Sequence, residues 1–341
     1  DLKKINYLDI LNRKTSPINN KLIKYLNNSN VLITGAAGSI GSELLLQISK
    51  TKVNKIICLD INETELFRLK QSIKNNKNIT YIISDIKNQS NMEKIIKKYK
   101  VEHIFHAAAY KHVDMLENNI EAAVKNNILG TLSLIKSLNK TVKNFIFIST
   151  DKAAKPINIL GVTKRFSELM CQYFSKFTKT NFSIVRFGNV FGSRGSAVEI
   201  FDYQIKNRLP ITLTNYKAKR YFMSITEACN LVMQCSQINS KGDVYLLNMG
   251  KQIKIYEIIK KMFKFYNLKN YPIKLIGLKK GEKLSEILSI SNKRIRTSHP
   301  DIYSFKEKKI KFDQIKKIIS MIENNINESL VIKNIKKIKN L

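Results

Sequence analysis

The sequence predicts an α/β fold in which a doubly wound parallel sheet carries a smaller C-terminal substrate-binding lobe. Two observations predict it. Short apolar runs with the β-branched and aromatic content of buried strands alternate with longer helical patterns from residue 30 onward. A glycine-rich turn separates the first of these runs from the first helical pattern. Strand–helix alternation of this kind is typical of parallel sheets with helices on both faces.

The elements follow one another in a regular order as far as Asn189. Strands are expected at residues 31–33, 56–59, 81–83, 103–107, 145–148 and 184–187. Helices are expected near residues 40–50, 63–75, 91–99, 118–139 and 157–177. After Asn189 the alternation gives way to loops and short helices, and residues 244–247 are expected to return to the sheet as a further strand.

A chain of 341 residues is long enough for one large domain with an appended lobe. Residues 1–29 are interpreted as an N-terminal extension and residues 30–188 as a Rossmann-like dinucleotide-binding domain, to which residues 220–250 return. The substrate lobe is expected to comprise residues 189–219 and 251–310. Residues 311–341 are expected to form a helical, lysine-rich tail.

The formal net charge of +34 does not by itself indicate a nucleic-acid partner. Lysine, asparagine and isoleucine are over-represented along the whole chain, whereas a nucleic-acid groove concentrates basic residues on one element. The densest lysines follow Lys306 in amphipathic patterns, which favours solvated helix faces over an anionic membrane or ligand.

The four cysteines form no C-x-x-C pair, and reduced thiols in a cytoplasmic protein are expected. No apolar run approaches the roughly 20 residues of a membrane helix. Because the chain begins at Asp1, an upstream membrane region of a longer inner-membrane protein is an open alternative.

The turn Gly35-Ala-Ala37-Gly38-Ser39-Ile40-Gly41 leaves a buried strand and enters a helix. Glycines allow a tight turn and close approach of the backbone to a pyrophosphate, and the helix N-terminus offers free N–H groups and a positive dipole end. The strand–turn–helix context makes this triplet a predicted dinucleotide site. The alternative is a glycine turn followed by a capped helix.

Asp60 ends the second expected strand, 19 residues past Gly41. A carboxylate there accepts hydrogen bonds from adenosine ribose hydroxyls and repels a 2′-phosphate, so NAD is favoured over NADP, although Arg68 weakens that preference. Further cofactor contacts are expected after the third and fourth strands and on the helix that follows, at Asp85, Ile86, Ala107, Ala108, Ala109 and Asn127.

His103, His106 and His112 show no metal-ligand spacing with carboxylates or cysteines, so no metal site is predicted.

Seven segments stand out as motifs: Thr34-Gly-Ala-Ala-Gly-Ser-Ile-Gly-Ser-Glu43, His106-Ala-Ala-Ala-Tyr-Lys-His-Val113, Asn127-Ile-Leu-Gly-Thr131, Ser149-Thr-Asp-Lys-Ala153, Arg186-Phe-Gly-Asn-Val-Phe-Gly-Ser-Arg-Gly195, Arg220-Tyr-Phe-Met223 and Gly281-Glu-Lys-Leu284. Together they resemble the bacterial polysaccharide-biosynthesis dehydratases of the CapD/PglF type, within the extended short-chain dehydrogenase/reductases. The resemblance covers about residues 5 to 290. The opening Asp9-Ile-Leu-Asn-Arg13 looks like the link between membrane region and catalytic domain in long members.

The resemblance implies a UDP-N-acetylglucosamine 4,6-dehydratase with NAD as cofactor. Such an enzyme oxidises C4 of the sugar, eliminates water across C5 and C6, and returns the hydride to C6. Thr150, Asp151, Lys152 and Lys164 are the expected catalytic residues, with Lys164 also binding the nicotinamide ribose. Asp151 and Lys152 are expected to divide the acid and base roles. A capped helix start is the structural alternative for this segment.

Leu160 occupies the position at which short-chain dehydrogenases usually carry a catalytic tyrosine. The PglF-like branch also lacks this tyrosine and retains the C5 configuration, so the resemblance implies a retaining enzyme. The nucleotide sugar is expected to contact Lys111, His112, Asn189, Arg194, Arg220 and Glu282, with solvated surface groups as the alternative. Lys279-Lys280 stands where family members usually show Arg-Pro, which puts one phosphate contact in doubt.

Two other functions remain open at this point: a UDP-sugar 4-epimerase, and a catalytically silent NAD-binding scaffold. Leu160 and the Asp151–Lys152 pair argue against the first, and the intact Thr150–Lys152 segment argues against the second. The family suggests a homo-oligomer.

Overall fold

The computed structural model describes residues 18–73, 76–238, 242–289, 294–305, 311–324 and 326–338. Most of the expected N-terminal extension, including Asp9–Arg13, lies outside the described residues. The part that is described, from residue 18 to residue 29, contains the short helices α2 (Asn20–Ile23) and η2 (Lys24–Leu26). It packs against the domain through Tyr25, whose hydroxyl donates to the carbonyl of Met233 at 2.8 Å.

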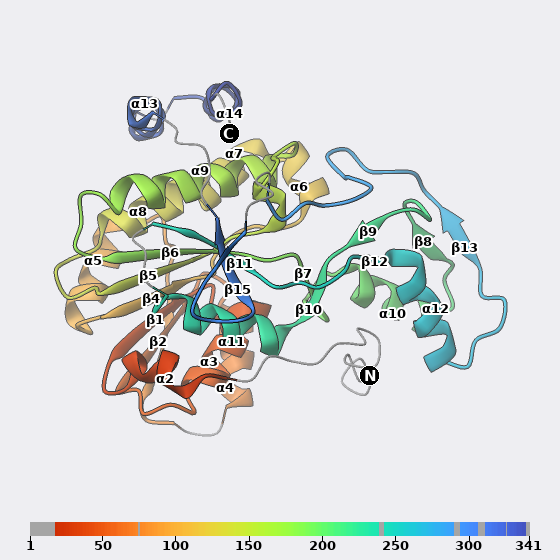
Figure 1. Ribbon diagram of the computed structural model, residues 1–341, viewed down its shortest axis with the longest axis horizontal. Coiled ribbons are helices and arrows are strands. Elements are labelled where there is room, and N and C mark those ends of the chain that lie inside the picture. Colours follow the sequence, from red (N-terminus) through yellow and green to blue (C-terminus); the bar gives the residue numbers. More distant parts are fainter. Residues whose placement is uncertain are drawn as a thin grey trace.

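Within the described ranges, nine strands form one sheet in the order β14-β15-β11-β6-β5-β4-β1-β2-β3 (Figure 1). The seven strands from β11 to β3 run parallel. Their bounds are β1 Asn30–Thr34, β2 Lys55–Asp60, β3 Ile79–Ile83, β4 His103–His106, β5 Asn144–Ile148, β6 Asn181–Arg186 and β11 Val244–Leu247. This confirms the predicted α/β class and the return of residues 244–247 to the sheet.

The edge of the sheet beyond β11 differs from the expectation. β15 (Ile302–Phe305) pairs antiparallel with β11, and β14 (Ile295–Arg296) pairs antiparallel with β15. The prediction that residues 251–310 belong wholly to the lobe is therefore wrong at its C-terminal end. The physical reason is that β11 would otherwise present an apolar, unpaired edge, which Ile302 and Phe305 help to cover while they are themselves buried.

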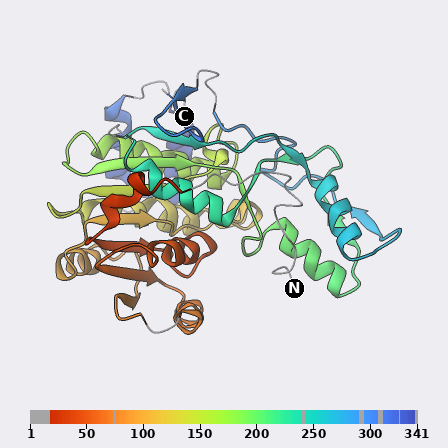
Figure 2. The ribbon, with the colours of Figure 1, turned by 60° about the horizontal axis from the view of Figure 1, so that its bottom comes forward.

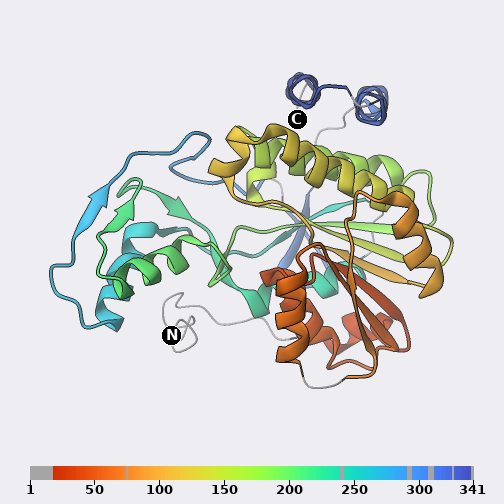
Figure 3. The same ribbon diagram turned by 180° about the vertical axis from the view of Figure 1, so that it is seen from behind.

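Helices cover both faces of the sheet (Figures 1 and 3). One face carries α3 (Ser39–Ile48), α4 (Glu63–Ser72) and α11 (Ile225–Cys235), and the other carries α5 (Gln89–Lys98), α8 (Gly130–Lys136) and α9 (Ile159–Phe174). The abundant asparagines help to start these helices, because a side-chain oxygen at the N-cap accepts from a free amide of the first turn. Asn62, Asn88 and Asn158 do so for α4, α5 and α9.

A smaller lobe stands at the carboxyl edge of the sheet, to the right in Figures 1 and 2. It contains α10 (Ala197–Lys206), α12 (Ile255–Phe265) and two small sheets, in which β8 (Ile211–Leu213) pairs with β13 (Ile273–Leu275), and β9 (Lys219–Arg220) pairs with β12 (Ile253–Lys254). Phe191, Phe201 and Ile259 belong to an apolar cluster that is separate from the main core. A third strand pair, β7 (Asn189–Phe191) with β10 (Phe222–Ser224), joins the lobe to the sheet.

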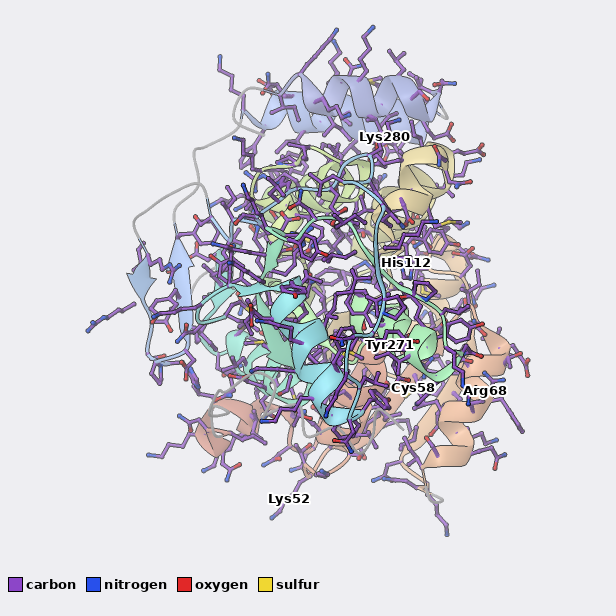
Figure 4. All side chains as sticks on the ribbon, turned by 90° about the vertical axis from the view of Figure 1, so that its right-hand side faces the viewer. Lys52, Cys58, Arg68, His112, Tyr271 and Lys280 are labelled. Carbon is purple, nitrogen blue, oxygen red and sulfur yellow. The ribbon has the colours of Figure 1, made fainter. Side chains whose placement is uncertain are left out.

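The C-terminal helices α13 (Phe312–Glu323) and α14 (Glu328–Lys336) lie above α9 (Figure 1). Their apolar faces join the main core through Ile315, Ile322 and Ile335, while their lysines remain on the outer face. Figure 4 shows side chains, among them that of Lys52, projecting around the outline of the molecule. Among the described residues, no helix is long and apolar enough to cross a membrane.

Candidate active site

The glycine turn directly follows β1, which lies between β2 and β4 in the sheet. Gly35 has φ +67°, and a Cβ built on it would come within 2.6 Å of the amide nitrogen of Ala108. The chain that follows β4 therefore packs directly on the turn. A Cβ on Gly41 would collide with the carbonyl oxygen of Gly35 at 2.2 Å. Only glycine fits these two positions, which closes the turn tightly at the point where strand order reverses.

The N-terminus of α3 is open toward this edge. Gly38 is the N-cap and offers no side-chain acceptor, so the first amides of the helix, from Ser39 to Gly41, have no side-chain cap. Amides of this kind and the positive end of the helix dipole favour an anion. The turn and the helix start thus fit a diphosphate.

Asp60 ends β2 beside the turn. Its Oδ2 accepts from the amide of Ala37 at 2.9 Å, and its Oδ1 accepts from the amide of Asn62 at 2.9 Å. Each oxygen keeps a second lone pair for a further donor. The two hydrogen bonds hold the carboxylate in one orientation, facing the position that a ribose would occupy in this fold.

Both arginines near Asp60 are paired with one glutamate. Arg68 lies 2.5 Å from Oε1 of Glu65, and the guanidinium of Arg194 contacts Oε2 of the same residue. Arg194 also donates to the carbonyl of Ala37 at 2.8 Å. Glu65 therefore engages both guanidinium groups and offsets one of their two positive charges.

The loops after β3 and β4 contribute smaller contacts. Asp85 is bound to its neighbour Lys87, whose ammonium lies 3.2 Å from Oδ2. Ile86 is buried, and a Cβ on Gly130 would lie 2.6 Å from its terminal methyl group. Ala107, Ala108 and Ala109 are half-buried along the loop that packs on the glycine turn.

Asn127 fixes this loop in place. It lies in η3, a π-helical segment (Val124–Leu129) between the α-helices α7 (Ile120–Ala123) and α8. Its Oδ1 accepts from the amide of Tyr110 at 2.8 Å, and its Nδ2 donates to the carbonyl of Tyr110 and to the hydroxyl of Thr163. Asn127 thus ties the loop after β4 to α9.

Thr150, Asp151 and Lys152 form one hydrogen-bonded cluster at the carboxyl end of β5. Thr150 is the N-cap of a short 3₁₀ helix, η4 (Asp151–Ala153). The Thr150 hydroxyl donates to Oδ1 of Asp151 at 3.0 Å, and Nζ of Lys152 donates to the same oxygen at 3.0 Å. Lys152 also lies 3.5 Å from Oδ1 of Asn189. The structure therefore brings four of the predicted site residues together.

The second carboxylate oxygen of Asp151 differs from the first in its hydrogen bonding. Asp151 is fully buried, and its Oδ2 accepts no hydrogen bond from any described residue. A Cβ on Gly188 would lie 3.2 Å from this oxygen. A buried carboxylate oxygen without a donor is costly, and such atoms concentrate at functional sites.

Lys164 lies on α9 with its ammonium 3.9 Å from the ring centroid of Phe147, the aromatic residue near the end of β5. Burial lowers the pKa of Lys164 from 10.5 to about 8, against the opposing charge of Glu168. Leu160, one turn earlier on α9, is buried among core side chains. The position at which short-chain dehydrogenases usually carry a tyrosine is thus filled by a core side chain that cannot transfer a proton.

A buried ionic network supports the catalytic segment from behind. Glu168 accepts from Ser149 at 2.6 Å, from Arg165 at 3.0 Å and from the Nε of Arg186 at 2.6 Å. The two guanidinium groups hold the pKa of Glu168 below its usual value despite burial. Because Ser149 directly precedes Thr150, the network fixes the backbone where the cluster begins.

The expected substrate residues fall into two groups. Lys111 donates to the carbonyl of Arg194 at 2.6 Å, and a Cβ on Gly195 would touch the ring of His112 at 2.5 Å. Together with the contacts of Arg194 described above, this first group lies against the glycine turn, and His112 lies on the side that faces the viewer in Figure 4.

The second group is in the lobe. Arg220 pairs with Glu282 at 2.9 Å, and the hydroxyl of Thr214 donates to the same carboxylate oxygen at 3.0 Å. Arg194 was expected to bind the nucleotide together with Arg220. It lies instead beside the glycine turn, where its guanidinium donates to the carbonyl of Ala37. Lys279, at the position of the missing arginine, pairs with Asp114 at 2.9 Å.

Sequence reasoning overlooked two carboxylates, Glu65 and Glu286. Glu286 is buried, with Oε1 4.0 Å from Nζ of Lys152. The sequence could have indicated Glu286, because this residue follows Glu282 by four positions in the segment that continues the Gly281–Leu284 motif. No group of three or more histidine, cysteine or carboxylate side chains in the described ranges is placed to bind a metal.

A cavity of about 420 Å³ opens beside this site, lined by residues that include Lys87, Tyr110 and Asn126. It adjoins the loop after β4, but none of its lining residues belongs to the predicted catalytic set. The clustering of buried polar groups at Asp151, and not this cavity, therefore identifies the centre of the site.

Comparison with known proteins gives a consistent family assignment. The chain is 38% identical over 301 residues to the capsular polysaccharide biosynthesis protein CapD of Staphylococcus aureus, an alignment that covers 86% of this chain and 50% of that protein. The chain thus spans about half the length of this relative and of a second one from Bacillus subtilis.

Two shorter relatives carry more specific names. An inverting UDP-N-acetylglucosamine 4,6-dehydratase of Campylobacter jejuni is 33% identical, with 78% of this chain and 79% of that protein covered. A UDP-glucose 4-epimerase of Rickettsia bellii is 32% identical, with 76% of each covered.

Among solved structures, Pen from Bacillus thuringiensis superposes with a TM-score of 0.77 and 33% identity, covering 82% of this chain and 88% of that one. The model of one family, described as polysaccharide biosynthesis protein, matches residues 31–307. Because this match takes in the glycine turn, the Thr150–Lys152 cluster and the Arg220–Glu282 pair, the chain belongs to the polysaccharide biosynthesis protein family.

Proposed function

We propose that this chain dehydrates UDP-N-acetylglucosamine, or a close UDP-sugar, to the 4-keto-6-deoxy sugar with retention at C5. The observation that carries the proposal is the buried carboxylate of Asp151, anchored through Oδ1 by Thr150 and Lys152 while Oδ2 accepts no hydrogen bond in the described part of the chain. An anchored base with one free oxygen, beside an ammonium, suits an elimination that needs both proton acceptor and proton donor.

The cofactor of the proposed reaction is NAD, which when bound would supply the acceptor for the C4 hydride and return that hydride to C6. The glycine turn and the uncapped start of α3 fit its diphosphate, and Asp60 fits its adenosine ribose. Ile86 and the alanines after β4 would line the dinucleotide. Lys164 would donate to the nicotinamide ribose.

The protein groups handle the protons. Thr150 binds the 4-hydroxyl and, through its hydrogen bond to Asp151, gives the proton of that hydroxyl a path to the carboxylate. The carboxylate passes that proton on to solvent, so it is again a base when the C4 ketone acidifies C5–H, and Oδ2 of Asp151 then removes the C5 proton. Lys152 donates a proton to the C6 hydroxyl, which leaves as water. Asp151 returns its proton to C5, Lys152 regains a proton from solvent, and the sugar has lost one water in total.

Retention at C5 follows in the proposal from Leu160. Without a tyrosine on α9, protons reach C5 only through the Thr150–Lys152 cluster. One group that removes and returns the proton on the same face of the sugar keeps the configuration. The relative from Campylobacter is named as inverting, so the proposal assigns this chain the opposite stereochemical outcome at C5.

The nucleotide would be held at the lobe. Arg220 and Glu282 are paired there, and an arginine suits the diphosphate while a glutamate suits ribose hydroxyls. Lys111, His112 and Arg194 lie at the opposite boundary, against the glycine turn, where the sugar and the cofactor would meet. The proposal therefore places the sugar between the turn and the Asp151 cluster.

The second candidate is a UDP-sugar 4-epimerase, favoured by the likeness to the rickettsial epimerase. An epimerase needs the same hydride transfer at C4 but no elimination at C6. Asp151 would accept the 4-hydroxyl proton in that reaction as well, but an ammonium that donates a proton to the C6 hydroxyl has no role in it.

Incubation with UDP-N-acetylglucosamine and NAD distinguishes the candidates. The product is analysed by mass spectrometry, and by proton NMR in deuterated water for C5. A product lighter by one water, with the gluco configuration retained, supports the proposal. An isomer of unchanged mass supports the epimerase. Unchanged substrate across a panel of UDP-hexoses would leave a silent NAD-binding scaffold.

A further inference from the structure

A second buried carboxylate, Glu286, lies beside the catalytic cluster. Glu286 is 2% exposed, and its Oε1 lies 4.0 Å from Nζ of Lys152. Asp151 contacts the same ammonium at 3.0 Å. Lys152 therefore lies between two buried carboxylates, one on η4 and the other on a segment more than 130 residues later in the chain.

The backbone that carries Glu286 is fixed to the lobe. Its carbonyl accepts a hydrogen bond from the side chain of Gln252, and Ser285 donates to the same Gln252 side chain at 2.6 Å. Ser285 also forms an isolated bridge with Lys219 of β9. These contacts hold the segment while the carboxylate of Glu286 reaches the cluster that follows β5.

Folding alone does not account for this arrangement. Burial of a carboxylate costs several kcal/mol unless cations and hydrogen bonds compensate. Lys283 lies 3.4 Å from Oε2 of Glu286, yet that oxygen accepts no hydrogen bond from a described residue. A buried group left in this state calls for another explanation, and its nearest catalytic neighbour is Lys152.

We propose that Glu286 is a positioning residue that fixes the ammonium of Lys152 beside Asp151 during the elimination. The charged groups that face Lys152 are Asp151 and Glu286, and Lys283 faces Glu286 from its other side. A carboxylate at salt-bridge distance attracts the ammonium and restricts where it can lie. Asp151 holds the ammonium in this way only until it takes up the C5 proton. From then on, Glu286 is the carboxylate that keeps the ammonium in place.

This inference rests on the proposed function, because Lys152 donates its proton to the sugar only in that reaction. The contact between Glu286 and Lys152 can nevertheless be tested in protein that is not turning over substrate. In the substrate-free protein, the rate at which an amine-acylating reagent modifies Lys152 is measured by peptide mass spectrometry between pH 7 and 11. Lys155, an exposed lysine three residues away, serves as control in the same digest.

In Glu286→Gln we expect Lys152 to be acylated at least about threefold faster across this pH range, with Lys155 unchanged, because one carboxylate fewer holds its ammonium. Dehydration should lose at least about tenfold in kcat while KM changes less than about threefold. Glu282→Gln, on the same segment but paired with Arg220, should instead raise KM and leave Lys152 acylation unchanged. Glu286→Asp, which keeps the charge, should recover most of kcat.

An acylation profile of Lys152 that is the same in Glu286→Gln and wild type overturns the proposal. If Glu286→Gln does not fold, Glu286→Asp decides: withdrawal of the charge by one methylene should shift the profile in the same direction by a smaller amount, and no shift rejects the role. If wild type does not dehydrate the sugar but the acylation shift is present, the proposed function fails while the Glu286–Lys152 coupling stands.

Discussion

Nζ of Lys152 lies 3.0 Å from Oδ1 of Asp151, while Oδ2 of the same buried carboxylate accepts no hydrogen bond within the described residues. The two oxygens of one side chain are thus in different states, one anchored and one free. Asp151→Asn should abolish water loss, by at least about 10³-fold in kcat, because an amide does not accept the C5 proton. Binding of NAD, followed by calorimetry, should be unchanged. Near-normal turnover of Asp151→Asn would remove Asp151 from the mechanism.

Lys164 should set an upper pH limit for NAD binding. Because burial lowers the pKa of Lys164 to about 8, its ammonium is present below that pH and is lost as the pH rises through it. We expect NAD affinity, measured by titration calorimetry, to fall between pH 7 and 9. Lys164→Arg stays charged over this range and should not show the fall. An equal decline in both proteins would assign the limit to another group.

Glu65 should control the choice of cofactor. Glu65→Gln releases Arg68 and Arg194 from their ion pairs, and both then become available to a 2′-phosphate. We expect affinity for NADPH to rise about tenfold relative to NADH, measured by nucleotide fluorescence. Glu63→Gln, on the same helical turn but without these arginine contacts, is the matched control. A ratio that does not change would show that Asp60 alone sets the preference.

Leu160 should be replaceable by another apolar side chain. Leu160→Met conserves volume in a buried position, so the loss of stability should be below about 1.5 kcal/mol. Turnover should stay within about threefold of wild type, and the C5 configuration should be unchanged by proton NMR. A large loss of kcat with normal stability would mean that Leu160 contributes more than packing.

His106 should make the fold sensitive to mild acid. Its two ring nitrogens pair with Thr34 and Thr131, and burial lowers its pKa to about 3. The folded state therefore keeps His106 neutral, whereas the unfolded state takes up a proton below about pH 6.5. Stability is lost as the pH falls from 6.5, by about 1 kcal/mol at pH 5.5 for this residue.

Urea unfolding at pH 7.5 and 5.5 measures this difference. His103 behaves in the same way, since burial lowers its pKa to about 4, so the two contributions add. His106→Asn should be less stable at pH 7.5 but should show a smaller decrease between the two pH values. The same decrease in wild type and His106→Asn would contradict the assignment.

The local part of this architecture could be predicted from the sequence. Strand cores such as Ile56–Leu59 are visible as apolar runs, and the glycine turn is defined by steric demands within a few residues. Asp60 and the Thr150–Lys152 cluster could be located because each follows directly after a strand, and strands of a parallel sheet end at one edge.

Contacts between distant segments were not predictable in the same way. The pairing of Arg194 with Glu65 joins residues 129 positions apart, and Glu286 reaches Lys152 from the lobe. Such pairs depend on how the lobe is placed on the sheet, which periodicity does not encode. The return of Ile302–Phe305 to the sheet edge escaped for a related reason: four residues carry too short a pattern to distinguish a strand from a loop.

The π-helical segment around Asn127 has one more residue than an α-helix would need to span the same rise. Deleting a single residue from Val124–Leu129 would let the segment close as a regular α-helix, at the expense of register. The helices α7 and α8 would keep nearly their present orientation, because the shorter α-helical segment makes about the same rotation and rise. Within the segment, Asn127 would turn away from Tyr110, and the loop that packs on Gly35 would lose its tether. In this protein an inserted residue sets the direction of one side chain and leaves the flanking helices in place.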